Sequence, residues 1–212
     1  MGIYLNPGNS GFVEITNGDY IDKTGMIELI NAKINTPKKL ICVSRPRRFG
    51  KSYAAQMLCA YYDCTCDSDS LFHQYQIADS KTYKEYLKQY NVIYLDISGF
   101  VSDVKRKNGD LRTLTDDITT SVRDELMKEQ PELKELSRIT DCFIAYVEKT
   151  KKKLVFIIDE WDAVIRESGK DEETQITYLN LLREWFKNGN LTSKVVACAY
   201  MTGILPIKKD GF

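Results

Sequence analysis

Gly50, Lys51 and Ser52 follow one another in the sequence, and their types suit the binding of a phosphate chain. Backbone N–H groups around a glycine can surround a phosphate, the ammonium group of lysine offsets the charge of the outer phosphates, and the hydroxyl of serine can ligate magnesium. An apolar run at residues 39–44 precedes them, and an apolar-periodic segment follows. This order of strand, loop and helix is the one that a phosphate-binding loop requires.

The loop departs from the usual P-loop pattern at Arg45, where the pattern G-x-x-x-x-G-K-[ST] has glycine. Pro46 also removes one N–H group, so the first part of the loop cannot surround a phosphate as a glycine-rich loop does. We expect the N–H groups of residues 49–52 to bind the phosphate, because the dipole of the following helix favours an anion there. From the glycine, lysine and serine alone, a chance helix start beside solvated arginines explains the sequence equally well.

Two acidic residues favour a nucleotide site over a chance helix start. Asp159 and Glu160 end the run of residues 153–160, whose apolar middle is typical of a buried parallel strand. P-loop NTPases place one acid at this position near the magnesium ion and the next near the attacking water. We therefore expect Asp159 to face the metal and Glu160 to face the water.

The chain alternates strand patterns with helix patterns, which implies a mostly parallel sheet with helices on both faces. Ligands of such sheets bind at the carboxyl ends of the strands, so the loop, the two acids and Thr202 should meet at one edge. We expect strands at 39–44, 91–97, 153–160 and 194–202, and helices at 52–62, 83–90, 115–129, 132–149 and 174–187. We also expect an irregular arm at 1–20 with a short strand at 11–15, a short helix after residue 24, and an exposed loop at 102–110.

Three polar residues allow two interpretations each. Asp22 and Thr24 either cap the short helix that follows them or lie near a nucleotide base. Asp96 ends the second expected strand, where it either caps a turn or approaches a ligand at the sheet edge. Capping is the favoured interpretation of Asp96.

The length and charge of the chain restrict its class. Its 212 residues fit one α/β domain, and 30 basic and 30 acidic residues give a formal net charge of zero. Net charge therefore gives no reason to expect nucleic acid or a membrane surface as a partner. No apolar run approaches about 18 residues and the N-terminus lacks the pattern of a signal peptide, so we expect a cytoplasmic protein.

The remaining chemistry-bearing residues give weaker signals. The six cysteines are scattered, which suits reduced and buried thiols, and Cys64 and Cys66 with the single His73 are too few for a structural zinc site. The lysine-rich run at 149–153 is better explained as the solvent-facing start of a strand than as a nucleic-acid contact. No arginine finger can be identified: Arg47, Arg48 and Arg183 are candidates, and a partner subunit is another source.

With these motifs in place, the sequence resembles the predicted AAA-ATPase-like family of bacterial proteins. The matching stretches are residues 20–25, 44–52, 157–162 and 201–205. The resemblance implies a three-layer, additional-strand P-loop ATPase fold that binds ATP and Mg²⁺, and it makes arginine at position 45 a family trait. By position, it assigns nucleotide binding to Arg48, Phe49, Gly50, Lys51, Ser52 and Asp159, metal binding to Ser52 and Asp159, and catalysis to Lys51, Glu160 and Thr202, with Thr202 as a sensor of the γ-phosphate.

The resemblance also bears on partners and function. Family members commonly continue into a nuclease-like domain of the PD-(D/E)XK type. The acids and lysine of such a nuclease do not appear in the 212 residues, so we expect a single domain at 1–212. The expected protein partner is a second copy of the chain or a nuclease-like domain fused to it. The leading hypothesis is a magnesium-dependent ATP-hydrolysing switch domain. The alternatives are a nucleotide-binding regulatory module that does not hydrolyse, and the ATPase part of a nucleic-acid processing system.

Overall fold

Four parallel strands form the central sheet of the computed structural model, which describes residues 2–205. The strand order is β1-β4-β3-β2, and every neighbouring pair is parallel. β4 therefore lies between β1, which leads into the phosphate loop, and β3, which ends in the acids. This arrangement confirms the predicted α/β fold with a parallel sheet. The strands are β1 (Leu40–Ser44), β2 (Asn91–Asp96), β3 (Leu154–Asp159) and β4 (Val196–Gly203).

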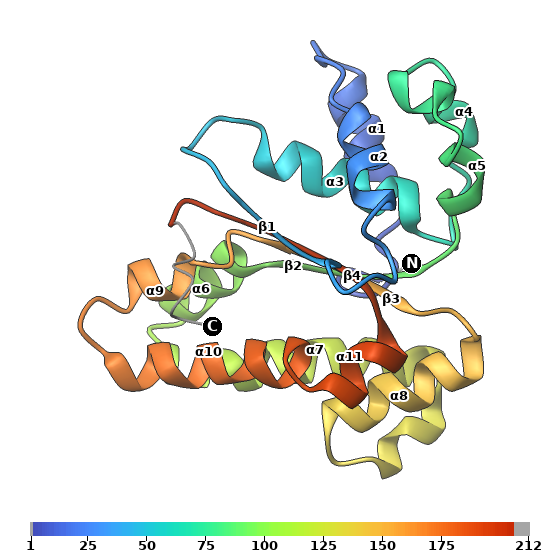
Figure 1. Cartoon of the computed structure of the whole chain (residues 1–212). Coiled ribbons are helices and arrows are strands. Elements are labelled where there is room, and N and C mark those ends of the chain that lie inside the picture. The colour runs from blue at the N-terminus through green and yellow to red at the C-terminus, as the bar shows by residue number, and fades with distance from the viewer. Residues whose placement is uncertain (1, 206–212) are drawn as a thin grey trace.

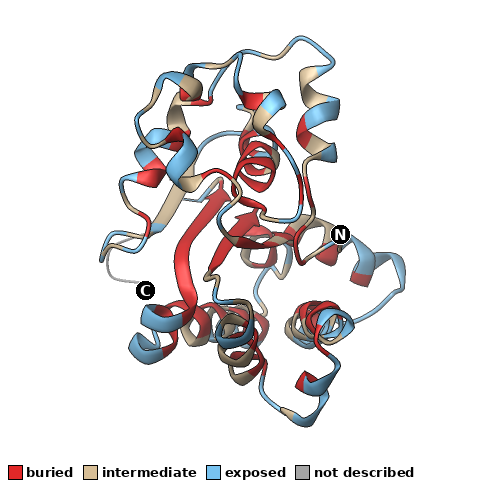
Figure 2. Ribbon diagram, turned by 90° about the vertical axis from the view of Figure 1, so that its right-hand side faces the viewer, coloured by how far each residue is buried: buried red, intermediate tan, exposed pale blue. Residues whose placement is uncertain are grey.

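The apolar runs seen in the sequence become the buried centre of the molecule. Every residue of β3 and β4 is buried, whereas β1 is half-buried and lies at one edge of the sheet. Figure 2 shows the strands as the buried layer between helices whose outer surfaces are exposed. Such runs are apolar on both faces because helices cover both faces of a parallel sheet.

One helical layer carries the helix that follows the phosphate loop. α3 lies against the sheet through residues that include Met57 and Leu58, which have no exposed surface. Its neighbours bring Phe12, Ile27 and Phe72 into the same apolar cluster, above the sheet in Figure 1. The helices of this layer are α1 (Ser10–Thr16), α2 (Gly25–Asn31), α3 (Lys51–Tyr62), α4 (Asp69–Phe72) and α5 (Tyr83–Tyr86), with a 3-10 turn at Gln76–Asp79.

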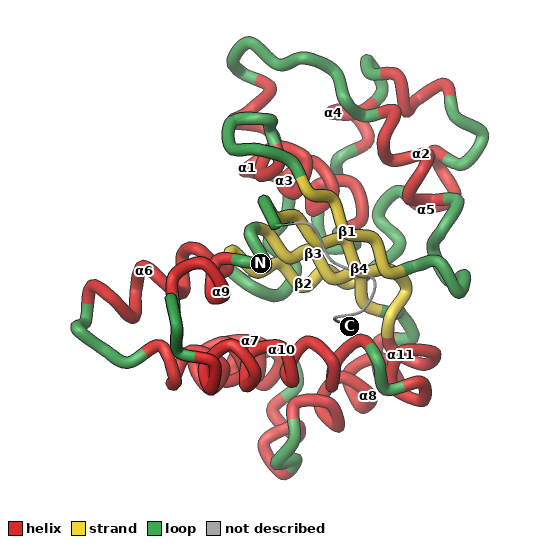
Figure 3. The backbone as a smooth tube through the Cα atoms, turned by 60° about the vertical axis from the view of Figure 1, so that its left-hand side comes forward, coloured by secondary structure: helices red, strands yellow, loops and turns green. Residues whose placement is uncertain are grey.

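The other helical layer covers the opposite face, below the sheet in Figure 1. In its centre, Phe143 packs edge to face against Phe156 and Trp185, with ring centroids 5.4 and 5.3 Å away, and Phe156 lies tilted against Trp185 at 5.9 Å. α6 and α9 lie side by side beyond one end of the sheet in Figure 3. The helices are α6 (Ile97–Arg106), α7 (Leu114–Glu129), α8 (Ile139–Thr150), α9 (Ala163–Glu167), α10 (Glu172–Phe186) and α11 (Gly189–Val195), with 3-10 turns at Leu111–Thr113 and Pro131–Glu135.

The predicted strand at 11–15 is wrong, because this segment forms helix α1. A helix places Phe12 and Ile15, three residues apart, on one face. Phe12 is fully buried and Ile15 packs against the same cluster. Contact with the layer around α3 therefore decides the conformation of a segment too short to reveal its period.

The predicted loop at 102–110 is also wrong in its first half, because α6 extends from Ile97 to Arg106. Phe100, Val101 and Val104 are buried along one side of this helix, with Ile97 one turn earlier. Asp96 caps the helix, since its side chain accepts a hydrogen bond from Gly99 N at 3.1 Å. The favoured interpretation of Asp96 as a cap is therefore confirmed.

Three predicted elements have different boundaries in the structure. The helix expected at 83–90 ends at Tyr86, because Lys88 is left-handed (φ 62°) and its N–H bonds to Tyr61 O near the end of α3. The helix expected at 132–149 is divided into a 3-10 turn and α8. Residues 194–195, expected in the last strand, end helix α11 instead.

The N-terminal arm covers the free edge of β2. Leu5 forms an antiparallel bridge with Ile93, and the N–H of Tyr94 donates to Tyr4 O at 2.8 Å. The Glu125 carboxylate of α7 accepts the N–H groups of the arm at residues 3–5, at 2.6–2.8 Å. The arm is thus held at the sheet edge by a buried carboxylate, which the sequence alone does not reveal.

Candidate nucleotide site

The loop between β1 and α3 has a backbone suited to an anion. Arg48 (φ 67°) and Gly50 (φ 71°) are left-handed, a conformation found in turns whose successive N–H groups face a bound anion. Gly50 is the N-cap of α3, and within residues 2–205 no side chain caps this helix start. Its first N–H groups therefore remain available to a ligand, and the helix dipole favours a negative one.

Lys51 is held over this loop. Its side chain is buried, with 8% of the residue exposed, and its ammonium group donates to the carbonyls of Arg45 at 3.1 Å and Pro46 at 3.0 Å. The unusual first half of the loop thus supplies acceptors that position the lysine. Pro46 lacks an N–H group, but its carbonyl accepts a hydrogen bond from Lys51. This role of the proline was not predicted from the loop pattern.

Asp159 and Ser52 are brought together across the sheet and α3. The carboxylate of Asp159 accepts a hydrogen bond from the hydroxyl of Thr202, and the hydroxyl of Ser52 is near enough to lower the pKa of this carboxylate. Burial raises the pKa of Asp159, and the nearby carboxylates of Asp96 and Glu160 raise it further, against the effect of the two hydroxyls. The sheet edge therefore holds a buried acid whose charge favours a nearby cation.

Thr202 lies inside this network. It has no exposed surface, and its Oγ1 donates to Asp159 Oδ1 and accepts the N–H of Glu160 at 3.2 Å. It orients both acids through these bonds. Its predicted contact with a γ-phosphate stays a prediction.

Glu160 follows the strand in an uncommon conformation. It is left-handed (φ 51°), and its N–H also approaches Asp159 Oδ1 at 3.2 Å. Its Oε2 accepts a hydrogen bond from Arg166 Nη2 of α9 at 2.7 Å, and both side chains are mostly buried, at 25% and 16% exposed. Arg166 could not be predicted from the sequence, because nothing in its local pattern distinguishes it from other helical arginines.

Asp162 connects the acids to the segment after β4. It has no exposed surface, and its Oδ2 accepts the N–H groups of Ile204 at 2.9 Å and Leu205 at 2.7 Å. Arg166 Nε lies 3.5 Å from the same oxygen. On the other side, Ser44 Oγ donates to Leu205 O at 2.7 Å, so this turn joins the phosphate loop to the acids.

Two cavities flank the start of α3. One, of about 630 Å³, lies between α1 and α3 and reaches Ser52, Gln56 and Tyr94. The other, of about 190 Å³, reaches Arg48 and Gly50 of the loop; it is further lined by residues 19–21, Lys23, Tyr53, Ala54 and Met57. Asp22 and Thr24 do not line it, and they accept the N–H groups of Gln76 and Ile77 instead.

The other residues singled out in the sequence lie apart from this network. Arg47 and Arg48 are exposed on the loop, and Arg183 Nη1 donates to Asn180 within α10 at 3.0 Å. All six cysteines are free thiols, of which Cys42 and Cys64 are half-buried and the other four are buried. Among the helices at residues 2–205, none is long and apolar enough to cross a membrane.

Comparison with known proteins agrees with the geometry of the site. A comparison with curated proteins gives no match. A family model described as predicted AAA-ATPase matches residues 8–212. Because this match covers nearly the whole chain, the protein belongs to the predicted AAA-ATPase family.

Proposed function

We propose that this protein is a magnesium-dependent ATPase that acts as a nucleotide switch. The observation that carries the proposal is the approach of Ser52 at the start of α3 to the buried Asp159 at the tip of β3, close enough for the serine hydroxyl to lower the pKa of that acid. It joins the two oxygen donors that the sequence assigns to magnesium. Family membership supports the class of activity.

The residues of the site fit both expected ligands. Carboxylate and hydroxyl oxygens are the donors that Mg²⁺ prefers, and the buried charge of Asp159 lacks a cationic partner among the contacts described above. Ser52 and Asp159 would hold the ion, which when bound offsets negative charge on the phosphates. The N–H groups of residues 48–52 and the ammonium of Lys51 would hold the phosphate chain.

Glu160 is the residue we assign to water activation. It directly follows Asp159, and the bond of its N–H to Thr202 fixes its backbone relative to that acid. A carboxylate at this position accepts a hydrogen bond from the water and orients it for in-line attack on the γ-phosphate. Lys51 stabilises the charge that the transferred group carries in the transition state.

One observation favours the second candidate, a nucleotide-binding module without turnover. The Glu160 carboxylate is already engaged by Arg166 at 2.7 Å, which opposes its use as a base. Hydrolysis therefore requires this contact to change. The nucleic-acid processing system stays a prediction of the resemblance alone.

Turnover by the wild type and Glu160→Gln separates the two candidates. We expect the wild type to release phosphate from ATP only with Mg²⁺, and the variant to bind ATP equally well while losing turnover by roughly 100-fold or more, as loss of a general base does. Equal hydrolysis rates in the two proteins would contradict the assignment of Glu160. Binding without turnover in both would favour the regulatory module.

A further inference from the structure

We propose that Arg166 is a positioning residue that restrains the carboxylate of Glu160 and couples it to the turn after β4. This inference rests on the proposed function, because it concerns the residue assigned to water activation. Arg166 contacts two carboxylates at once: Nη2 lies 2.7 Å from Glu160 Oε2, and Nε lies 3.5 Å from Asp162 Oδ2.

The restraint joins two elements of the fold. Asp159 reaches Ser52, so its side chain is on the α3 side of the sheet. Arg166 belongs to α9, whose Ala163 and Val164 pack in the cluster on the opposite face. The ion pair therefore ties the Glu160 carboxylate to α9, an element that does not carry the phosphate loop.

The ion pair between Arg166 and Glu160 is partly shielded from water. Arg166 is 16% exposed, Glu160 is 25% exposed and Asp162 is fully buried. Ion pairs in such surroundings are screened less than those at the surface. A carboxylate engaged in this way is poorly available to a water molecule, so hydrolysis requires Arg166 to release it.

Asp162 supplies the other end of the link. Its Oδ2 accepts both N–H groups of the turn at residues 204–205, and Ser44 at the start of the phosphate loop donates to the carbonyl of Leu205. A shift of this turn changes the position of Asp162. Because Arg166 contacts both Asp162 and Glu160, its ion pair with Glu160 then becomes stronger or weaker. A change at the phosphate loop can thus reach Glu160 through this turn.

A double-mutant cycle tests the ion pair without nucleotide. Urea unfolding of the wild type, Glu160→Gln, Arg166→Gln and the double variant gives the coupling between the two side chains. We expect a coupling of about threefold or more in the unfolding equilibrium constant, as for residues in contact. Arg106→Gln, which breaks an exposed pair with Asp103 on α6, is the matched control and should show no coupling with Glu160→Gln.

ATP turnover by the same proteins tests the restraint. We expect Arg166→Gln to raise kcat severalfold with an unchanged Kd for ATP, Arg166→Lys to lie nearer the wild type because it keeps the charge, and Arg106→Gln to change nothing. Absence of coupling, or a lower kcat in Arg166→Gln, would overturn the proposal. If Arg166 and Glu160 are coupled but no variant hydrolyses ATP, the ion pair exists and the proposed hydrolysis is wrong. That result would also contradict the claim that loss of Arg166 frees Glu160 to act as a base.

Discussion

Gly203 is a position where the site leaves no space for a side chain. A Cβ atom there would lie 2.6 Å from Trp161 Nε1 and 3.1 Å from Asp162 Cγ. Both neighbours are buried, so neither can move aside without disturbing the residues that flank Glu160. The close approach of chain segments at Gly203 explains why glycine follows Thr202.

Replacing Gly203 with alanine should therefore destabilise the protein. We expect a loss of about 1–3 kcal/mol in the free energy of unfolding, which is typical of overpacking in a filled core. Urea unfolding measures this loss. Gly189→Ala is the control, because nothing lies within 4 Å of a Cβ there, and it should change stability little. Equal effects of the two changes would contradict the packing described for Gly203.

Asp22 gives a prediction about pH. Burial tends to raise its pKa, but hydrogen bonds from Gln76 and Thr24 outweigh this and lower it. A lowered pKa in the folded state means that the ionised form stabilises the fold above the pKa of the unfolded chain, about 3.9. This stabilisation is lost as the pH falls through the folded-state value.

The melting temperatures of the wild type and Asp22→Asn should show this stabilisation by ionised Asp22 at neutral pH and its loss in acid. We expect the variant to melt at a lower temperature at pH 7, and the difference to shrink as the pH falls below about 4. Thermal melts across this range provide the measurement. A difference that is as large at pH 3 as at pH 7 would show that the charge of Asp22 is not responsible.

Residue types alone predicted much of the candidate site. Lys51, Ser52, Asp159 and Glu160 lie at the same sheet edge because the carboxyl ends of parallel strands meet there. Arg166 was not predicted, since its contact with Glu160 depends on how α9 turns back after the strand. A left-handed residue at a strand end has no dependable signature in a sequence either.

At the scale of elements, the N-terminal arm depends on one helix of the opposite layer. Glu125 of α7 is 8% exposed, and it accepts three N–H groups from residues 3–5. These bonds anchor the arm that covers β2 and continues into α1. The arm therefore links a buried charge in one layer to the wall of the larger cavity beside α3.

Removal of this carboxylate should release the arm. We expect Glu125→Ala to cost at least about 2 kcal/mol, because a hydrogen bond to a charged group is worth about 1.5–3 kcal/mol. Unfolding experiments give the loss, and amide hydrogen exchange at residues 3–5 locates it. Asp124→Ala, at the exposed neighbouring position of α7, should have little effect on either measurement. Unchanged exchange at the arm in Glu125→Ala would contradict the anchor.

The elements that sequence patterns missed are short or mixed with polar residues. α1 has only seven residues, too few for a period to be seen, and α6 carries its buried side chains among polar ones that suggested a loop. The four strands and the long helices α3, α7 and α10 were predicted within a few residues. Their apolar runs and stripes are long enough to define a period.

At the scale of the whole molecule, the sheet gathers residues from four distant segments. β4 lies between β1 and β3, so its end meets the phosphate loop on one side and the acids on the other. The N–H of Arg45 donates to Gly203 O, and the N–H of Trp161 donates to Thr202 O. This order could not be read from alternation of elements alone, which predicts a parallel sheet but not which strands are neighbours.

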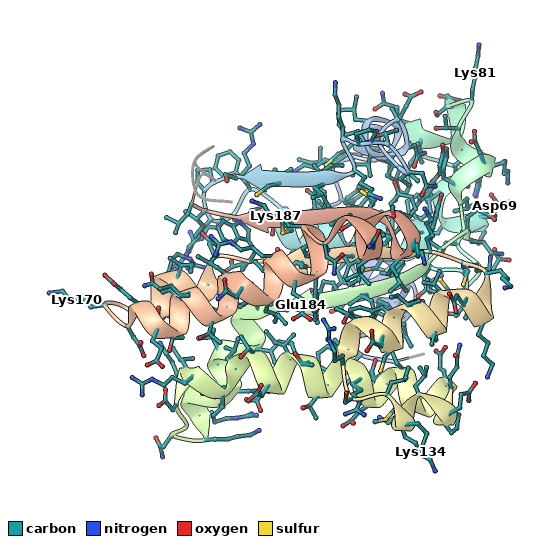
Figure 4. All side chains as sticks on the ribbon, turned by 60° about the horizontal axis from the view of Figure 1, so that its bottom comes forward. Asp69, Lys81, Lys134, Lys170, Glu184 and Lys187 are labelled. Carbon is teal, nitrogen blue, oxygen red and sulfur yellow. The ribbon has the colours of Figure 1, made fainter. Side chains whose placement is uncertain are left out.

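Magnesium-dependent binding of ATP, measured by calorimetry, is the most direct test of the nucleotide site. Lys51→Ala removes the ammonium group held over the phosphate loop, and Lys81→Ala is the control, since Lys81 projects outward from the exposed segment before α5 (Figure 4). We predict that the wild type and Lys81→Ala bind equally and that Lys51→Ala binds roughly 30-fold more weakly or not at all, a loss of about 2 kcal/mol or more. Equal affinities in all three proteins, or no binding by the wild type, would contradict a nucleotide site at this loop.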